Sequence, residues 1–121
     1  MSTLKVNDIQ EATSGGGKIF PPRAWVNFNG TGTVAIRDDG NVSSITDRGT
    51  SRFTVNFSNS FGNSTYAATG NINNTGQGAE SVAIESSQSN YIGSGFVMIH
   101  TTRHNAGFDP DHCNIIATGD G

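Results

Sequence analysis

Branched aliphatic residues almost replace leucine in this chain of 121 residues. Ten isoleucines and seven valines stand against a single leucine, Leu4. Branching at Cβ is tolerated on a pleated strand but is crowded against the preceding turn of a helix. Glycine, asparagine, serine and threonine, which favour turns and solvated strand faces, make up close to half of the residues. The sequence therefore predicts an all-β protein.

Short strand-like runs recur from Ala24 onwards and are separated by turn residues, which is typical of a small antiparallel β-sandwich or barrel-like domain. We expect strands near 24–29, 33–37, 41–46, 52–57, 65–70, 81–85, 95–102 and 114–118. Turn residues at 38–41 and 47–49 favour two hairpins, because Asp, Asn and Gly tolerate a positive φ. The first four strands are thus predicted to form a meander.

Trp25, the only tryptophan, falls on the polar side of the first strand. Alternation places Val26 and Phe28 on one face and Trp25, Asn27 and Asn29 on the other. A tryptophan among polar neighbours packs against a loop or a neighbouring subunit, or serves as a ligand platform. We expect Trp25 to be a subunit-packing residue.

Residues 1–23 are predicted to form an extended N-terminal arm that precedes a β-domain over 24–121. A triple glycine at 15–17 and a proline pair at 21–22 separate the two parts. Leu4, Val6 and Ile9 have no large apolar partner nearby in the arm, so a disordered tail is one interpretation. The other, which we expect, is that these three residues anchor the chain to other subunits or to a larger assembly.

Charge and hydropathy exclude several classes of function. Seven Lys and Arg residues stand against ten Asp and Glu residues, giving a net charge of -3, so we expect no nucleic-acid binding. No apolar run approaches the roughly 18–20 residues that cross a bilayer, and residues 1–10 lack the apolar segment of a secretory signal. We therefore expect a soluble protein with no membrane insertion.

Association is expected because the chain has little to hold an isolated domain together. Its one cysteine, Cys113, cannot form an internal disulfide, and 33% of its residues are hydrophobic. A domain of this size buries only about 65% of its unfolded surface. Contacts with other copies would supply the missing burial.

The residues that could do chemistry form no catalytic pattern. Asp38 and Asp39 are adjacent, and Asp109 and Asp111 are one residue apart, but all four lie in turns, where Asp usually bonds backbone groups. No nucleophile motif or phosphate-binding loop is present. We predict a binding or structural domain that is not an enzyme and needs no cofactor.

A metal site is also not predicted within one chain. Histidines and the cysteine gather in the last quarter of the sequence, at His100, His104, His112 and Cys113. Their spacing matches no closed zinc site. A metal on a trimer axis stays open as an alternative, and Cys113 is expected to be a buried, inert thiol.

Two stretches resemble a known group of proteins. The opening STLKVNDIQ and the block AWVNFNGTGTVAIRDDGNVSSITDRGTSRFTVNF resemble tail-fibre and other virion structural proteins of tailed bacteriophages, particularly those of cyanobacteria. The likeness covers 3–10 and 24–57 closely. Beyond these, only the rhythm of the strands and the end of the chain are similar.

This resemblance implies a homotrimer that is made in the host cytoplasm and located in the virion, in contact with other virion proteins. Only residues 11–23 separate the two similar stretches, which leaves no room for a long shaft. We therefore expect a short tail fibre or fibre tip that binds the host cell surface without enzymatic activity. A head or tail decoration protein, which stabilises the particle through its arm, is the alternative.

Loops of the distal half are the expected places of host attachment. They carry aromatic, amide and imidazole groups that could contact a surface polysaccharide. The candidate receptor contacts are Tyr91, His104, Asn105 and Phe108.

Overall fold

The computed structural model describes residues 3, 9–10, 12, 18–19, 22–73, 80–85, 89–103 and 106–119. These residues form strands and connecting turns, with no helix among them. The strands are β1 (Ile9–Gln10), β2 (Lys18–Ile19), β3 (Pro22–Asn29), β4 (Ala35–Gly40), β5 (Val42–Asp47), β6 (Arg52–Phe57), β7 (Ala67–Ile72), β8 (Glu80–Ile84), β9 (Ile92–Gly93), β10 (Phe96–Arg103), β11 (Ala106–Gly107) and β12 (Cys113–Thr118). The all-β prediction is confirmed, and each of the eight expected strands is present with ends that differ by a few residues.

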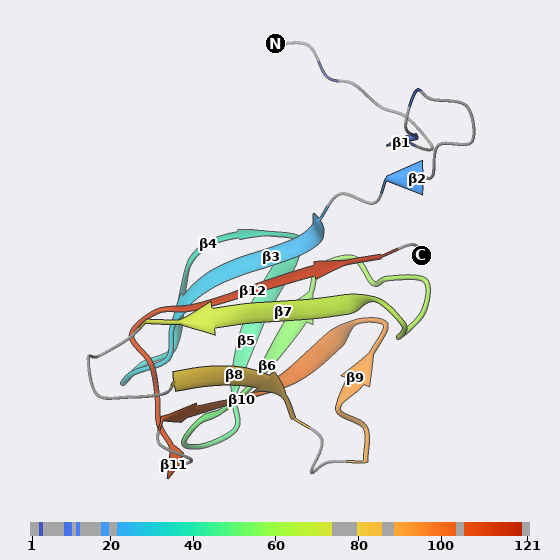
Figure 1. Cartoon of the computed structure of the whole chain (residues 1–121). Coiled ribbons are helices and arrows are strands. Elements are labelled where there is room, and N and C mark those ends of the chain that lie inside the picture. The colour runs from blue at the N-terminus through green and yellow to red at the C-terminus, as the bar shows by residue number, and fades with distance from the viewer. Residues whose placement is uncertain are drawn as a thin grey trace.

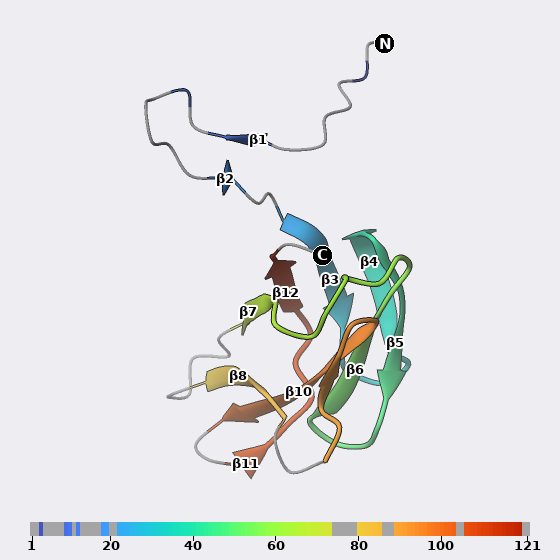
Figure 2. The ribbon, with the colours of Figure 1, turned by 90° about the vertical axis from the view of Figure 1, so that its right-hand side faces the viewer.

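Two antiparallel sheets form a sandwich (Figures 1 and 2). The first sheet has the strand order β4-β3-β12-β7. In the second sheet, β10 is central: β6, followed by β5, lies on one side of it, and β8 lies on the other. The short strands β9 and β11 extend the neighbours of β10 on the β8 side and the β6 side, respectively.

The predicted four-stranded meander is wrong at its second turn. β3 pairs with β4 and β5 pairs with β6, but β4 and β5 belong to different sheets. Asn41 takes a left-handed conformation (φ 59°), and it bonds to Ser58 and Asn59 beyond the end of β6. These bonds hold the chain against the second sheet, so the turn becomes a crossing between layers that lets the two apolar faces meet.

The second predicted hairpin is confirmed. β5 and β6 pair antiparallel around the turn at 47–49, where Gly49 has a φ of 114°. The carboxylate of Asp47 accepts a hydrogen bond from the Gly49 backbone N–H at 3.0 Å. Turn chemistry that is local in the sequence was sufficient to predict this connection.

The core lies between the two sheets. β3 and β12 contribute one layer of buried side chains and β6 and β10 the other, and the rings of Phe28 and Phe53 meet edge to face with centroids 5.3 Å apart. A second aromatic group, formed by Phe57, Phe61 and Tyr66, closes one part of the core. The Tyr66 hydroxyl lies 2.8 Å from the Gly93 carbonyl and 2.7 Å from the Phe96 carbonyl, so it joins this group to the β9–β10 turn.

The described parts of the arm pair with each other. Ile9 lies opposite Ile19 in a two-stranded sheet that is separate from both sheets of the sandwich. β2 lies beyond the end of the sandwich at which β3 begins (Figures 1 and 2). Leu4 and Val6 fall outside the described residues, and of Ile9 only the backbone is described. Anchoring through these three residues stays a prediction, as does the trimer.

Candidate functional site

The outer face of the first sheet presents an exposed aromatic ring beside a row of amides. Strand register brings Trp25 of β3 next to Ile116 of β12, which in turn lies next to Thr69 of β7. The adjacent row consists of Asn27, Asn114 and Asn71 on the same three strands. We call these six residues the Trp25 face. Rows on one face of a sheet are about 6–7 Å apart along the strand, so both rows could contact one small ligand.

Trp25 rests on a glycine. On its other side the register places Gly40 of β4, and a Cβ atom at that position would lie 2.2 Å from the indole Nε1. The ring therefore covers the backbone of β4, where any larger residue would displace it. Trp25 remains 40% exposed and Ile116 remains 45% exposed, so together they form an apolar platform on the surface.

The amides form a hydrogen-bonded row across three strands. The Asn27 Nδ2 donates to Asn114 Oδ1, and the Asn114 Nδ2 donates to Asn71 Oδ1 at 2.8 Å. At the start of the row, Arg37 donates from Nη1 to Asn27 Oδ1 at 3.3 Å, while its Nη2 donates to the Asp111 carbonyl at 2.6 Å. Asn27 and Asn114 each use one N–H within the row, which leaves a second N–H for a ligand or water. The side chains are thus held in place before any ligand arrives.

Such a surface suits a sugar ring. The C–H face of a pyranose is apolar and stacks on an aromatic face, whereas its hydroxyl groups both donate and accept hydrogen bonds. The Trp25 face offers an indole and a methyl-rich neighbour for the first contact and oriented amides for the second. The sequence prediction placed Trp25 correctly on the polar face, and nothing in the single chain tests the expected subunit packing.

Two of the predicted receptor contacts, Tyr91 and Phe108, lie on opposite sides of β10. Tyr91 is at the β9 side of β10, where its carbonyl accepts a hydrogen bond from the Met98 N–H at 2.8 Å. Phe108 is at the opposite side of β10, where its carbonyl accepts from Thr101 Oγ1 at 2.6 Å and its ring lies 5.0 Å from Arg103 Cζ. Tyr91 is exposed and Phe108 is half-buried. His104 and Asn105 lie outside the described residues.

Three of the four aspartates accept hydrogen bonds from backbone groups, as predicted, but Asp38 and Asp39 lie in strand β4 and not in a turn. Asp38 Oδ1 accepts from the Asp39 N–H at 2.9 Å, and Asp39 Oδ2 accepts from the Val42 N–H at 3.1 Å. Asp109 Oδ1 accepts from the Ser51 N–H at 2.7 Å. These carboxylates shape turns and loops.

Glu85 is a buried carboxylate that the sequence patterns did not single out. It follows β8 and forms an ion pair with Arg52, whose Nε lies 3.4 Å from Glu85 Oε2. Its backbone N–H also donates to the Met98 carbonyl at 2.8 Å, which fixes the end of β8 against β10. The guanidinium balances the buried negative charge, so this pair acts within the second sheet.

Cys113 is the buried thiol that the sequence predicted. It is 0% exposed at the start of β12, and burial raises its pKa to about 12. A thiol in this environment is neutral and inaccessible at physiological pH. Among the residues that the structure describes, no three His, Cys, Asp or Glu side chains are close enough together to hold a metal ion.

Comparisons with known proteins add no relative. No protein-family model, no curated protein and no solved structure matches the chain. Within the described ranges, no helix has the length and apolar character needed to cross a membrane.

Proposed function

We propose that this chain is a structural protein of a tailed-phage virion and that its β-sandwich attaches the particle to a polysaccharide of the host surface without cleaving it. The resemblance of 3–10 and 24–57 to virion proteins supports the assignment to a particle. The Trp25 face is the observation that carries the attachment function, because it combines an exposed indole with a pre-positioned row of amides.

Binding at one such face would be weak, since it is flat and open to water. A sugar would stack on Trp25 and Ile116 and exchange hydrogen bonds with Asn27 and Asn114. Three copies in a fibre, and several fibres on a particle, raise the effective affinity by roughly 10² to 10⁴ without any new contact. Attachment by many weak sites fits a protein with a polar, shallow surface.

A non-enzymatic role is favoured by what the acidic groups do. Asp38, Asp39 and Asp109 accept hydrogen bonds from backbone N–H groups. The buried carboxylate of Glu85 is paired with the exposed Arg52. A glycosidase would need two carboxyl groups several ångströms apart on either side of a bound sugar. The Trp25 face itself contains no carboxylate.

A decoration protein is the second candidate. It is favoured by the apolar residues of the arm and by the uncharged edge of β7, both of which suit contact with other subunits. In that case a neighbouring subunit would cover Trp25 in the assembled particle. This agrees with the sequence prediction that Trp25 is a subunit-packing residue.

Fluorescence tests the attachment directly, because Trp25 is the only tryptophan in the chain. Titration of the full chain with purified host polysaccharide should shift the emission maximum to shorter wavelength as the indole leaves water. The W25A variant should lose adsorption to host cells. Y91A serves as the matched control, since Tyr91 is an exposed aromatic residue beside the other sheet, and it should adsorb normally.

Three results would contradict the proposal. Loss of adsorption in Y91A with normal adsorption in W25A would move attachment to the loops. Normal adsorption in both, with unstable particles in W25A, would select the decoration protein. Release of new reducing ends from the polysaccharide by the wild-type chain would show that it is an enzyme.

A further inference from the structure

The edge strand β7 lacks the features that protect other sheet edges in this protein. β4, at the opposite edge of the first sheet, has Arg37, Asp38 and Asp39, and its pairing with β3 contains a bulge. β5, an edge of the second sheet, ends in Asp47 and also contains a bulge. By contrast, β7 reads Ala-Ala-Thr-Gly-Asn-Ile, and its register with β12 is unbroken. Charges, prolines and bulges are the usual defences of an exposed edge against pairing with another chain.

The sandwich is open where β7 faces the second sheet. On one side, the two sheets are joined by the crossing from β4 to β5, whereas on the other side the edge strands β7 and β8 lie next to each other (Figure 2). Among the residues that the structure describes, β7 pairs only with β12 and β8 only with β10, so these two strands form no ladder with each other. Within this part of the chain, each keeps an unpaired edge along the opening.

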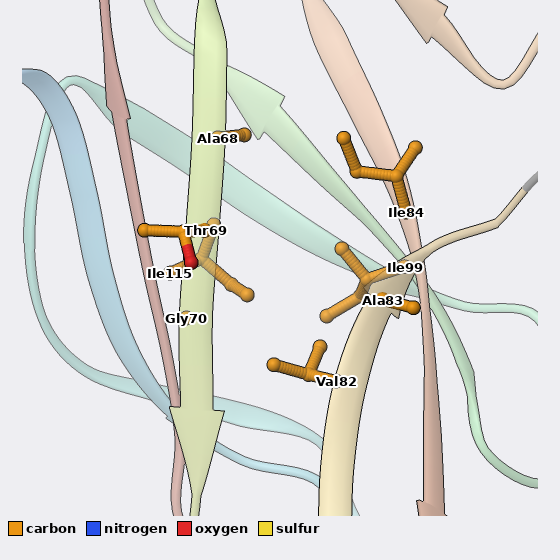
Figure 3. A pocket seen from close by; sticks show the side chains of 8 residues that line it. All are labelled: Ala68, Thr69, Gly70, Val82, Ala83, Ile84, Ile99 and Ile115. Carbon is orange, nitrogen blue, oxygen red and sulfur yellow. The ribbon is translucent and has the colours of Figure 1, made fainter.

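An apolar groove lies in this opening. Ala68 of β7 and Val82 and Ile84 of β8 point into it from its two sides, and Ile99 and Ile115 of the core form its floor (Figure 3). Its volume is about 80 Å³, several times the ~10–15 Å³ that one water molecule needs. The lining residues are Ala68, Thr69, Gly70, Val82, Ala83, Ile84, Ile99 and Ile115.

Ile84 shows that the groove is a gap in the core. It lies directly opposite Ile99 on the inward face of the second sheet. Ile99 is 2% exposed, yet Ile84 is 37% exposed, because the small residues Ala68 and Gly70 stand across from it. Because the groove is open to water, an aliphatic group that enters it removes apolar surface from water, which is favourable.

We propose that the N-terminal segment of a second copy of this chain pairs along the free edge of β7 and places Leu4 and Val6 in the groove. A strand added to β7 would point alternate side chains inward. In residues 3–7 the alternation is Thr, Leu, Lys, Val, Asn, so the two aliphatic residues share one face and Lys5 lies on the other. The inner face would then close the core, and the outer face would remain polar.

The position and length of the arm favour a neighbouring copy. The arm joins the sandwich at Pro22, and Thr118 of β12 lies between Pro22 and Ala67, so the arm leaves at the end of the sheet where β7 begins, two strands away from β7. β2 lies beyond this end of the sandwich (Figure 1). Ile9 lies opposite Ile19 in the β1–β2 pair, and Ile19 is three positions before Pro22, so the segment that precedes Ile9 starts beyond this end of the sandwich. The eight residues that precede Ile9 span up to about 26 Å when extended, which is enough to reach a neighbouring copy beyond that end.

Disulfide trapping between two separately purified chains tests this pairing. Lys5 would lie on the outer face of the added strand, and the Thr69 side chain points away from the groove (Figure 3), so K5C and T69C leave the aliphatic lining intact. The native Cys113 is fully buried. Mixing the K5C and T69C chains with a mild oxidant should give a cross-linked dimer. Mixing K5C with T46C, an exposed position on the remote strand β5, should give at least about tenfold less.

Association measurements provide the second readout. I84S should weaken self-association of the full chain at least about tenfold, because removing a buried aliphatic side chain costs more than that factor. I116S is the matched control, as it removes a similarly exposed isoleucine from the Trp25 face, and it should associate normally. Equal cross-linking of K5C to the T46C chain, cross-links only within a K5C/T69C double variant, or a wild-type chain that stays monomeric at micromolar concentration would overturn the proposal.

Discussion

Gly40→Ala is expected to move the Trp25 ring without disturbing the backbone. The added Cβ would lie 2.2 Å from Nε1 and 2.8 Å from Cδ1 of the indole, whereas ordinary van der Waals contact begins at 3.4 Å. The ring must therefore move by about 1.2 Å, the difference between the first and last of these distances. Gly40 is not among the residues with positive φ, so alanine can adopt its conformation.

The energetic cost should be small because the ring can move toward solvent. Overpacking a well-packed interior typically costs about 1–3 kcal/mol. Trp25 lies on an outer face and is 40% exposed, so we expect the lower end, about 1 kcal/mol. In a domain of this size that corresponds to a decrease in Tm of about 4–8 °C. The emission maximum should shift to longer wavelength, since more of the indole meets water, and binding of polysaccharide should weaken.

Urea unfolding followed by tryptophan fluorescence measures both effects in one experiment. Gly49→Ala is the control: Gly49 has a φ of 114° and no atoms within 4 Å of its added Cβ, so this variant should lose stability through backbone strain with native emission unchanged. If G40A has the wild-type emission maximum and unfolding midpoint, the indole does not rest on Gly40 and the geometry of the Trp25 face is wrong.

Three further predictions concern buried and bridging groups. Burial raises the pKa of Tyr66 to about 12 from 10.0, so Tyr66 ionises at a lower pH in the unfolded chain than in the folded one. The free energy of unfolding should therefore fall as the pH rises from about 10 to about 12. In urea titrations, Y66F should reduce this pH-dependent loss, and it should cost about 1–2 kcal/mol at neutral pH because its hydroxyl hydrogen bond is lost. The Cys113 thiol should resist alkylation in the native protein at about pH 8 and react in urea, and fast native labelling would contradict its burial. N114A breaks two bonds of the amide row and N71A breaks one, so the first should lose about 0.5–1.5 kcal/mol more; equal losses in urea unfolding would mean that the row does not act as a connected unit.

The candidate site could be predicted only in part from the sequence. Alternation placed Trp25 on the outer face, because the face of a strand residue depends on its immediate neighbours. The amide row was not predicted, since Asn27 and Asn114 are 87 residues apart and Asn114 and Asn71 are 43 apart. The only sequence signal was an asparagine at an outward position in each of three strands, and that signal does not show which strands are neighbours.

The loops chosen as receptor contacts illustrate the same limit. Tyr91 and Phe108 are both near β10 in sequence, and their chemistry suits sugar contact. Pairing of β10 with β9 on one side and β11 on the other separates them. Side-chain type is a property of the sequence, whereas convergence of side chains on one ligand depends on pairing between segments.

By itself, the sequence determined the all-β class, the approximate strands, the hairpin at 47–49 and the burial of Val26, Phe28 and Cys113. These features follow from β-branching, a period of two and turn residues, all of which act over a few neighbouring positions. Tertiary structure decided that the chain crosses between sheets at Asn41, that three distant asparagines align, and that β7 keeps an open edge beside an apolar groove. Hydrogen-bond register and sheet membership are set when the two apolar faces pack together, and that packing depends on residues far apart in the chain.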